Sequence, residues 1–170
     1  MQIKKTEDFI KGLLDKMGFD KFVVEVTEKD GDLFAEIISV GNNNVIGYRG
    51  ETLDAIQYLT SLIVNAKTTS KHKRIIVDSE NYRQKREKSL QGYARKMEQK
   101  VKKSQRAEKL EPMNPFERRI VHTALQNSEW VTTESEGDEP NRYVVISPTL
   151  TLAKTRKTLN FVYRSDKKRK

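Results

Sequence analysis

The chain has 170 residues, which allows one ordinary domain or two small ones, and it carries a formal net charge of +9. It contains no cysteine, so disulfides and thiolate metal sites are excluded and a cytoplasmic location is expected. No apolar run approaches the roughly 20 residues of a membrane span, and the charged N-terminus does not resemble a signal peptide, so no stable membrane insertion is expected.

The first half of the chain predicts six elements in the order α-β-β-α-α-β. Apolar residues recur at helical spacing before Gly18, and two alternating segments flank a turn at Asp30–Gly31. The predicted elements are a helix over 6–17, strands over 21–28 and 32–39, a short helical turn within 41–46, a helix over 51–66 and a strand over 73–79.

The second half predicts a long charged helix over 80–105, a helix from about 115 to 126, and a hairpin of strands at 130–136 and 141–147. Asn114 is the expected N-cap of the second of these helices, because Pro115 follows at its first position. The tail from Thr149 to Lys170 has a weak apolar patch and a basic end, and we expect little firm structure in it.

The positive charge is concentrated in two segments. Residues 67–109 carry a net charge of +10 and residues 149–170 a net charge of +7, whereas residues 1–66 and 110–148 each carry −4. A concentrated basic segment favours a polyanionic partner, because Lys and Arg neutralise phosphates and release counterions. A solvated helix face is the alternative interpretation of the central segment.

Two glycines frame Tyr48 and Arg49 immediately before the helix that starts at Glu51. Glycine lets a ligand atom approach the backbone, and helix N-termini present unpaired N–H groups that bind phosphates. Gly47–Tyr48–Arg49–Gly50 in this context resembles the GXXG loop of a KH domain, and the element order resembles the type II form. The resemblance implies a loop that clamps the backbone of about four nucleotides of a single strand. The family usually has a basic residue where this chain has Tyr48, so the phosphate role is expected of Arg49 and the backbone amides.

Arg118 and His122 are four residues apart and share one helix face. With their flanking residues, "EPMNPFERRIVHTALQ" and "ESEGDEPNRYVVISP", they resemble the R-three-H domain, a family that binds single-stranded nucleic acid. The resemblance implies binding through Arg118 and His122, with Asn114, Arg119 and Arg142 in the matching segments.

A KH segment, a long helix and an R-three-H segment in this order resemble the bacterial Jag family, also called KhpB. We therefore expect an α+β chain: a type II KH domain over 1–79, a linker helix with a small α/β R-three-H domain over 80–148, and a basic tail over 149–170. Many family members carry a further N-terminal domain that these 170 residues do not include, so a short form and a fragment are both open, and the tail after Pro148 does not resemble the family. The family implies single-stranded RNA as ligand, with single-stranded DNA as the alternative. It also implies a KH-containing partner protein or a homodimer, and a link to cell shape, the cell envelope or membrane-protein biogenesis.

Signatures of common enzymes are absent from the sequence. It has no phosphate-binding P-loop, no H-E-x-x-H and no G-x-S-x-G, and it has only two histidines. The acidic pairs Asp30/Asp32 and Asp138/Glu139 fall in predicted turns and are interpreted as solvated. We therefore expect a non-catalytic binding protein without a cofactor or metal. The alternatives are a protein-interaction adaptor and a protein that attaches to anionic membranes through its basic tail.

Overall fold

The structure is a computed structural model that describes residues 2–39, 45–66 and 72–149. The chain divides into two compact units, Met1–Arg86 and Glu87–Lys170, and the division falls inside a helix. Both units combine helices with a small three-stranded sheet, which confirms the expected α+β class. The expectations for residues 41–44 and for the tail beyond Thr149 lie outside the described residues.

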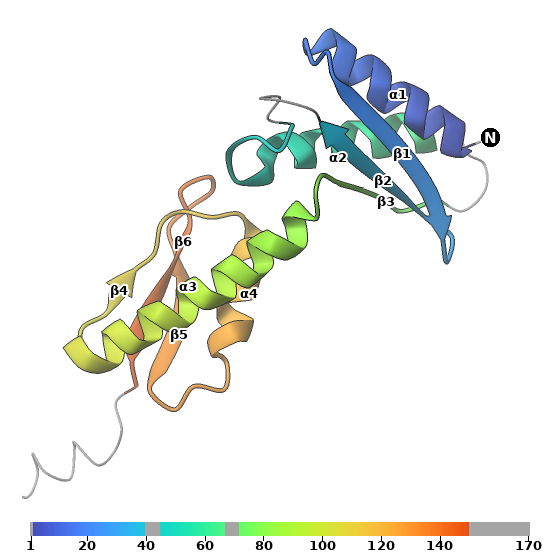
Figure 1. The fold of residues 1–170 in the computed structure, drawn as a ribbon. Coiled ribbons are helices and arrows are strands. Elements are labelled where there is room, and N and C mark those ends of the chain that lie inside the picture. Colours follow the sequence, from blue (N-terminus) through green and yellow to red (C-terminus); the bar gives the residue numbers. More distant parts are fainter. Residues whose placement is uncertain (1, 40–44, 67–71, 150–170) are drawn as a thin grey trace, which may run out of the picture. The chain divides into compact units, whose positions relative to one another are not determined.

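The first unit has its elements in the order α1 (Gln2–Lys16), β1 (Phe22–Lys29), β2 (Asp32–Ser39), η1 (Tyr48–Gly50), α2 (Glu51–Asn65) and β3 (Ile75–Asp78). Its sheet has the order β1-β2-β3, with β1 and β2 antiparallel and β2 and β3 parallel (Figure 1). The predicted turn lies at Asp30 and Gly31, which both have positive φ. Parallel pairing requires the chain to cross over between β2 and β3, and α2 lies on that crossover.

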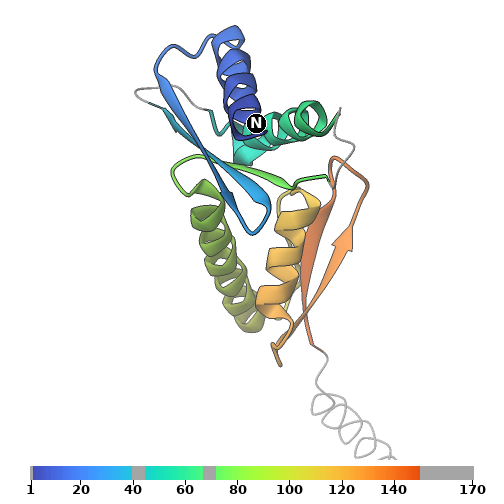
Figure 2. The same cartoon turned by 90° about the vertical axis from the view of Figure 1, so that its right-hand side faces the viewer.

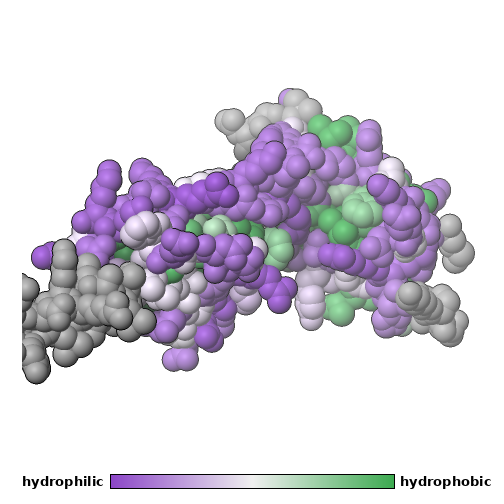
Figure 3. Space-filling view, turned by 90° about the horizontal axis from the view of Figure 1, so that it is seen from below, coloured by the Kyte–Doolittle hydropathy of each residue, from purple (hydrophilic) through white to green (hydrophobic). Residues whose placement is uncertain are grey.

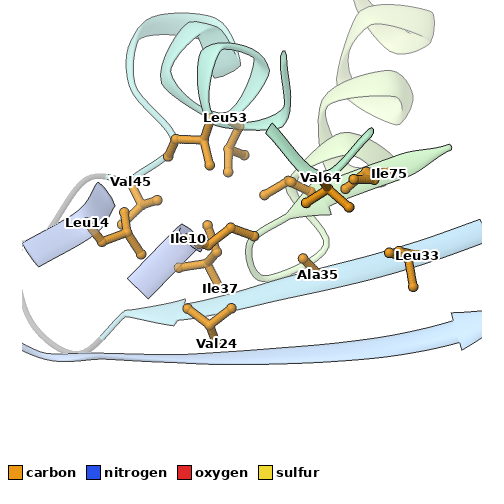
Figure 4. Packing of buried hydrophobic residues seen from close by; sticks show 12 residues of the cluster. Ile10, Leu14, Val24, Leu33, Ala35, Ile37, Val45, Leu53, Val64 and Ile75 are labelled. Atoms are coloured by element: carbon orange, nitrogen blue, oxygen red, sulfur yellow. The ribbon is translucent and has the colours of Figure 1, made fainter. Parts of the chain in front are cut away.

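One apolar core holds this unit together. Alternate residues of β2, namely Leu33, Ala35 and Ile37, are buried, as the period of two in a strand requires. Ile10 and Leu14 of α1 and Leu53 and Val64 of α2 cover them (Figure 4). Burying each such aliphatic side chain stabilises the fold by about 1.5–3 kcal/mol. Because α1 and α2 cover the same buried side of β2, the two helices occupy one face of the sheet.

The second unit contains most of α3 (Tyr82–Ser104), followed by β4 (Glu108–Lys109), α4 (Pro115–Leu125), β5 (Val131–Glu136) and β6 (Tyr143–Pro148). Its antiparallel sheet has the order β4-β6-β5, so β6 is central. The core combines Ala94 and Val101 of α3 with Val121 and Leu125 of α4 and Ile146 of β6. Figure 2 shows α4 running beside the β5–β6 hairpin.

Most predicted boundaries agree with the structure to within a few residues, and two features differ. Strand β4 was not predicted, because two residues carry no readable alternation; it is defined by its pairing with Val145 and Ile146 of β6. Within 41–46, the described residues Val45 and Ile46 are not helical, and a 3-10 turn occurs slightly later at Tyr48–Gly50. A hydrophobic pattern cannot place such a single turn to the residue.

The face of the molecule in Figure 3 is mostly hydrophilic, and apolar side chains reach the surface in separate patches. Among the described residues, no helix is both long enough and apolar enough to cross a membrane.

Candidate nucleic-acid interface

The backbone of the loop at Gly47–Gly50 is held in a conformation that few residues adopt. Gly47 has φ 73°, Arg49 has φ 52° and Gly50 has φ 88°. Positive φ is cheap for glycine and costly for residues with a Cβ atom. The loop therefore turns sharply into α2, and Arg49 is the one non-glycine residue of the three that accepts this strain.

Space as well as conformation requires the two glycines. A Cβ atom on Gly47 would lie 2.0 Å from Thr52 Oγ1, and one on Gly50 would lie 2.7 Å from the Tyr82 ring. Both distances are shorter than any non-bonded contact allows. The protein's own packing thus accounts for both glycines, since Thr52 and the Tyr82 ring fill the space beside them and Gly50 is buried.

The two middle residues of the loop place an aromatic ring and a cation together. Tyr48 is 67% exposed, and the Arg49 guanidinium lies 4.9 Å from the centre of its ring. A ring held by a cation can stack on a base while the guanidinium contacts phosphate. Asp54 in the first turn of α2 would oppose a phosphate, but its carboxylate pairs with Arg83 at 2.8 Å. Glu51 in the same turn is exposed.

Arg118 points into the second unit instead of toward solvent. It is 8% exposed, and it donates from Nη1 to the Met113 carbonyl at 2.7 Å and from Nη2 to Glu139 Oε1 at 2.6 Å. Glu139, which we expected to be a solvated turn residue, is therefore the ion-pair partner of Arg118. Asn114 is the predicted N-cap of α4, and its Oδ1 accepts from the Glu117 amide at 2.9 Å.

His122 links α4 to the β5 strand through both ring nitrogens. Nδ1 lies 2.7 Å from Thr133 Oγ1 and Nε2 lies 2.8 Å from Ser135 Oγ. Burial lowers the pKa of His122 below its ordinary value of 6.5, and the nearby Arg118 charge lowers it further. A neutral imidazole suits this position, because one nitrogen can donate and the other accept.

Arg142 and Arg119 differ in their hydrogen bonding and in their exposure. Arg142 donates from Nη2 to the Ser135 carbonyl at 3.4 Å, and its buried Nε has no partner among the described residues. Arg119 is exposed on α4. Arg118 and His122 thus lie between α4 and the β5–β6 hairpin, Arg142 bonds within the hairpin, and Arg119 is exposed.

Sequence patterns did not single out Phe116, which is 61% exposed at the start of α4. It lies three residues before Arg119, so the two exposed side chains share a helix face. An aromatic residue at a helix start is usually counted toward the core, so only its exposure draws attention to it. Trp130 is a similar case, since it is 48% exposed and Lys102 Nζ lies 3.6 Å from its ring centre.

Comparison with protein families matches both parts of the chain. Residues 6–77 match the model of the KH domain of KhpA and KhpB, and residues 88–148 match the R-three-H domain model. The RNA-binding protein KhpB of Clostridium symbiosum is 42% identical over 144 residues, which cover 84% of this chain and 64% of that protein.

Two further relatives carry the same name. The RNA-binding protein KhpB of Bacillus subtilis is 40% identical over 105 residues, 61% of this chain and 50% of that protein. That of Streptococcus pneumoniae is 37% identical over 103 residues, 60% of this chain and 31% of that protein. The chain thus matches less than two thirds of the length of each of these relatives.

Proposed function

Because this chain belongs to the KhpB family, we propose that it is a non-catalytic protein that binds single-stranded RNA through two modules. The first module, residues 1–79, uses the Gly47–Gly50 loop. The second, residues 80–148, uses the surface at the start of α4, where Arg119 and Phe116 are exposed beside the inward-facing Arg118 and His122.

The geometry of the Gly47–Gly50 loop is the observation that carries the proposal. The exposed Tyr48 ring, the Arg49 guanidinium and the start of α2 lie within four residues. Backbone amides and a guanidinium suit phosphate oxygens, which all sequences share, and a ring face suits any base. Such a site binds single strands, whose bases are free to stack.

The test replaces both middle residues by aspartate, Tyr48→Asp with Arg49→Asp, in the full chain. We expect the affinity for an unstructured RNA of 30 nucleotides to fall at least about tenfold, since a cation is lost and two anions face phosphate. Ile3→Asp with Lys4→Asp is the matched control, because it makes the same charge change in the first turn of α1, where acidic residues are favourable.

Fluorescence anisotropy measures the affinity, and circular dichroism with a melting curve checks the fold. Unchanged affinity in a loop variant that melts like the parent protein would contradict the proposal for the first module. Equal losses in the loop variant and the control would mean that net charge alone controls binding.

In the cell, we propose a cytoplasmic role in post-transcriptional regulation connected with the cell envelope or membrane-protein biogenesis, which rests on the family alone. Crosslinking followed by sequencing of the bound RNA tests it. Enrichment of messages for envelope or membrane proteins is the expected result, and a set of RNAs that merely follows abundance would contradict it.

A second candidate function is an adaptor that pairs with another KH protein or with its own copy. The observation that favours it is the exposed apolar side of α2, where Tyr58, Leu59, Leu62 and Ile63 are each 41–64% exposed. Adjacent exposed apolar side chains are typical of protein interfaces. Leu62→Glu should abolish self-association in sedimentation experiments without changing RNA affinity; a parent protein that sediments as a monomer at all concentrations excludes the homodimer.

A further inference from the structure

Helix α3 carries a row of cations on its solvent side within the second unit. Lys88, Arg95, Lys96 and Lys103 are exposed, and they recur at intervals that place them on the face opposite the buried Leu90, Ala94 and Val101. From the first to the last, the row extends about 22 Å along the helix at about 1.5 Å per residue.

The part of the chain that the structure describes does not neutralise this row by ion pairing. None of its four cations forms an ion pair with a carboxylate of the described residues, whereas Lys100 pairs with Glu108 and Lys102 lies over the Trp130 ring. The acidic residues of α3 in this unit are engaged elsewhere: Glu87 accepts from Gln91, and Glu98 accepts from Ser128. Uncompensated like charges repel one another, so the row has a cost that a polyanion would relieve.

Gly92 lies in the middle of the row, and no contact with the described residues requires a glycine there. It is exposed within the helix, its φ is not positive, and a Cβ atom added to it would meet nothing within 4 Å. Glycine inside a helix lowers stability relative to alanine. Gly47 and Gly50 are explained by internal clashes, whereas Gly92, like Gly12, has open space beside it. What distinguishes Gly92 is its place within the row of cations, where a bare helix backbone lets a strand approach closely.

A shallow polar groove borders the row. Arg95, Glu98 and Gln99 of α3 line one side, and Asn127 and Ser128, after α4, line the other. The exposed amides of Gln99 and Asn127 can both donate and accept hydrogen bonds, which suits the edges of unpaired bases.

We infer that the face of α3 around Gly92 is a third contact for single-stranded RNA, in which the strand backbone crosses the helix at Gly92 between Lys88 and the Arg95–Lys96 pair. The inference rests on the proposed RNA-binding function and adds a site to it. The cations neutralise phosphates, and the groove at Gln99 and Asn127 receives a base. This contact needs no particular sequence, because every nucleotide has a phosphate for the cations, and the side-chain amides can both donate to and accept from any base.

An anionic membrane surface is the other polyanion that a basic helix can bind. Helices that lie in membranes insert an apolar face opposite their charges. The apolar face of α3 is buried in the core of the second unit, so it is not available to lipid. The observations therefore favour RNA.

The experiment uses the full chain and a labelled, unstructured RNA of 30 nucleotides made of A and U. Lys88→Gln, Arg95→Gln and Lys96→Gln together should lower the affinity about tenfold or more. The slope of log affinity against log salt should become shallower by about 2, since each phosphate contact to a single strand contributes about 0.7. The matched control, Lys4→Gln with Lys16→Gln and Lys21→Gln, makes the same charge change in the first unit and should alter the slope much less.

Gly92 is tested separately from charge. Gly92→Gln should lower the affinity severalfold, because its side chain fills the space of the crossing strand. Gly12→Gln is the control, since Gly12 is also an exposed helical glycine with nothing near its missing Cβ. Melting temperatures of both variants exclude unfolding as the cause.

A cysteine probe reports contact directly, because the chain has no cysteine of its own. RNA should protect the thiol of Gln99→Cys from alkylation and leave that of Gly12→Cys unprotected. The α3 site would be overturned if RNA protected Gln99→Cys and Gly12→Cys equally, or if the triple variant of Lys88, Arg95 and Lys96 bound RNA like its control. The Tyr48/Arg49 loop variant tests the proposed function independently of these results. Vesicles of anionic lipid that protect Gln99→Cys when RNA does not would assign the face to membranes. A parent protein that does not bind RNA at all would overturn the proposed function and this site together.

Discussion

The signature residues of the two units differ in exposure. In the first unit, Tyr48 is exposed with the Arg49 guanidinium over its ring, whereas in the second unit Arg118 and His122 turn inward and bond to the hairpin. The first motif is thus a surface whose shape depends on glycine. In the second motif, Arg118 and His122 hold α4 against the turn before β6 and against β5. The side chains of the second motif are therefore already bonded within the protein, whereas the Tyr48 ring of the first motif is exposed.

The largest contrast should come from neighbouring arginines. Arg118→Ala should lower the free energy of unfolding by about 2–4 kcal/mol, because the Met113 carbonyl and Glu139 lose a buried cationic partner. Arg119→Ala removes an exposed side chain and should change stability by less than about 0.5 kcal/mol. Denaturant unfolding followed by Trp130 fluorescence measures both. Similar stability of the two variants would mean that the inward position of Arg118 has been misjudged.

The next contrast lies between two glycines of the first unit. Gly47→Ala should destabilise the unit by about 1–3 kcal/mol, since a Cβ atom there meets Thr52 at a φ of 73°. Gly12→Ala should stabilise α1 by about 0.5–1 kcal/mol, because that position is helical and open. Thermal unfolding gives the two values, and opposite signs are the outcome that matters. Thr52→Ala should rescue Gly47→Ala only in part, because the Thr52 amide nitrogen also lies 2.9 Å from the added atom.

A smaller effect concerns binding by the second unit. Phe116→Ala should weaken RNA binding by about 1 kcal/mol, the low end of the usual value for a stacked base, without changing the melting temperature. Tyr58→Ala is a suitable control, because it removes another exposed aromatic ring, 64% exposed, from α2 of the first unit, outside the proposed RNA contacts. Filter binding to RNA measures both variants. Equal affinities for the two would leave Phe116 without a role in stacking.

The smallest effect is a pH response of opposite sign in the two units. The pKa of His122 is lowered in the folded state, mainly by burial, so the unfolded chain binds the proton more readily. The second unit should therefore lose stability as the pH falls below about 6.5. The pKa of Glu36 is raised above 4.5, first by burial and then by Asp78 and Glu25, so the folded chain binds that proton more readily. The contribution of Glu36 is complete below about pH 4.5 and is lost as the pH rises through its raised pKa.

Two measurements separate the effects of His122 and Glu36. Trp130, the one tryptophan of the chain, reports unfolding of the second unit between pH 5 and 8. The melting temperature of Glu36→Gln minus that of the parent protein should increase from pH 4.5 to pH 7. The reason is that the amide removes the penalty that the ionised carboxylate brings to the folded state. A difference that stays constant over this range would show that Glu36 titrates normally.

Periodicity and turn chemistry were sufficient to place most helices and strands and the N-cap at Asn114. These signals are local: a helix stripe repeats within a few residues, and a cap bonds three residues along the chain. The position of the loop at Gly47–Gly50 followed in the same way from two glycines at a helix start. The regions matched by the KH and R-three-H models were likewise found from short motifs in the correct order.

Only the tertiary structure decided which side chains face inward. Arg118 and Arg119 are adjacent and equally basic in the sequence, yet one meets Glu139, 21 residues away, and the other meets solvent. Strand β4 exists only because β6, more than 30 residues later, supplies its partners. Gly92 and Gly47 are likewise the same residue type, but Thr52 fills the space beside Gly47, whereas the space beside Gly92 is open. Contacts between distant parts of the chain depend on packing in three dimensions, and no local pattern carries that information.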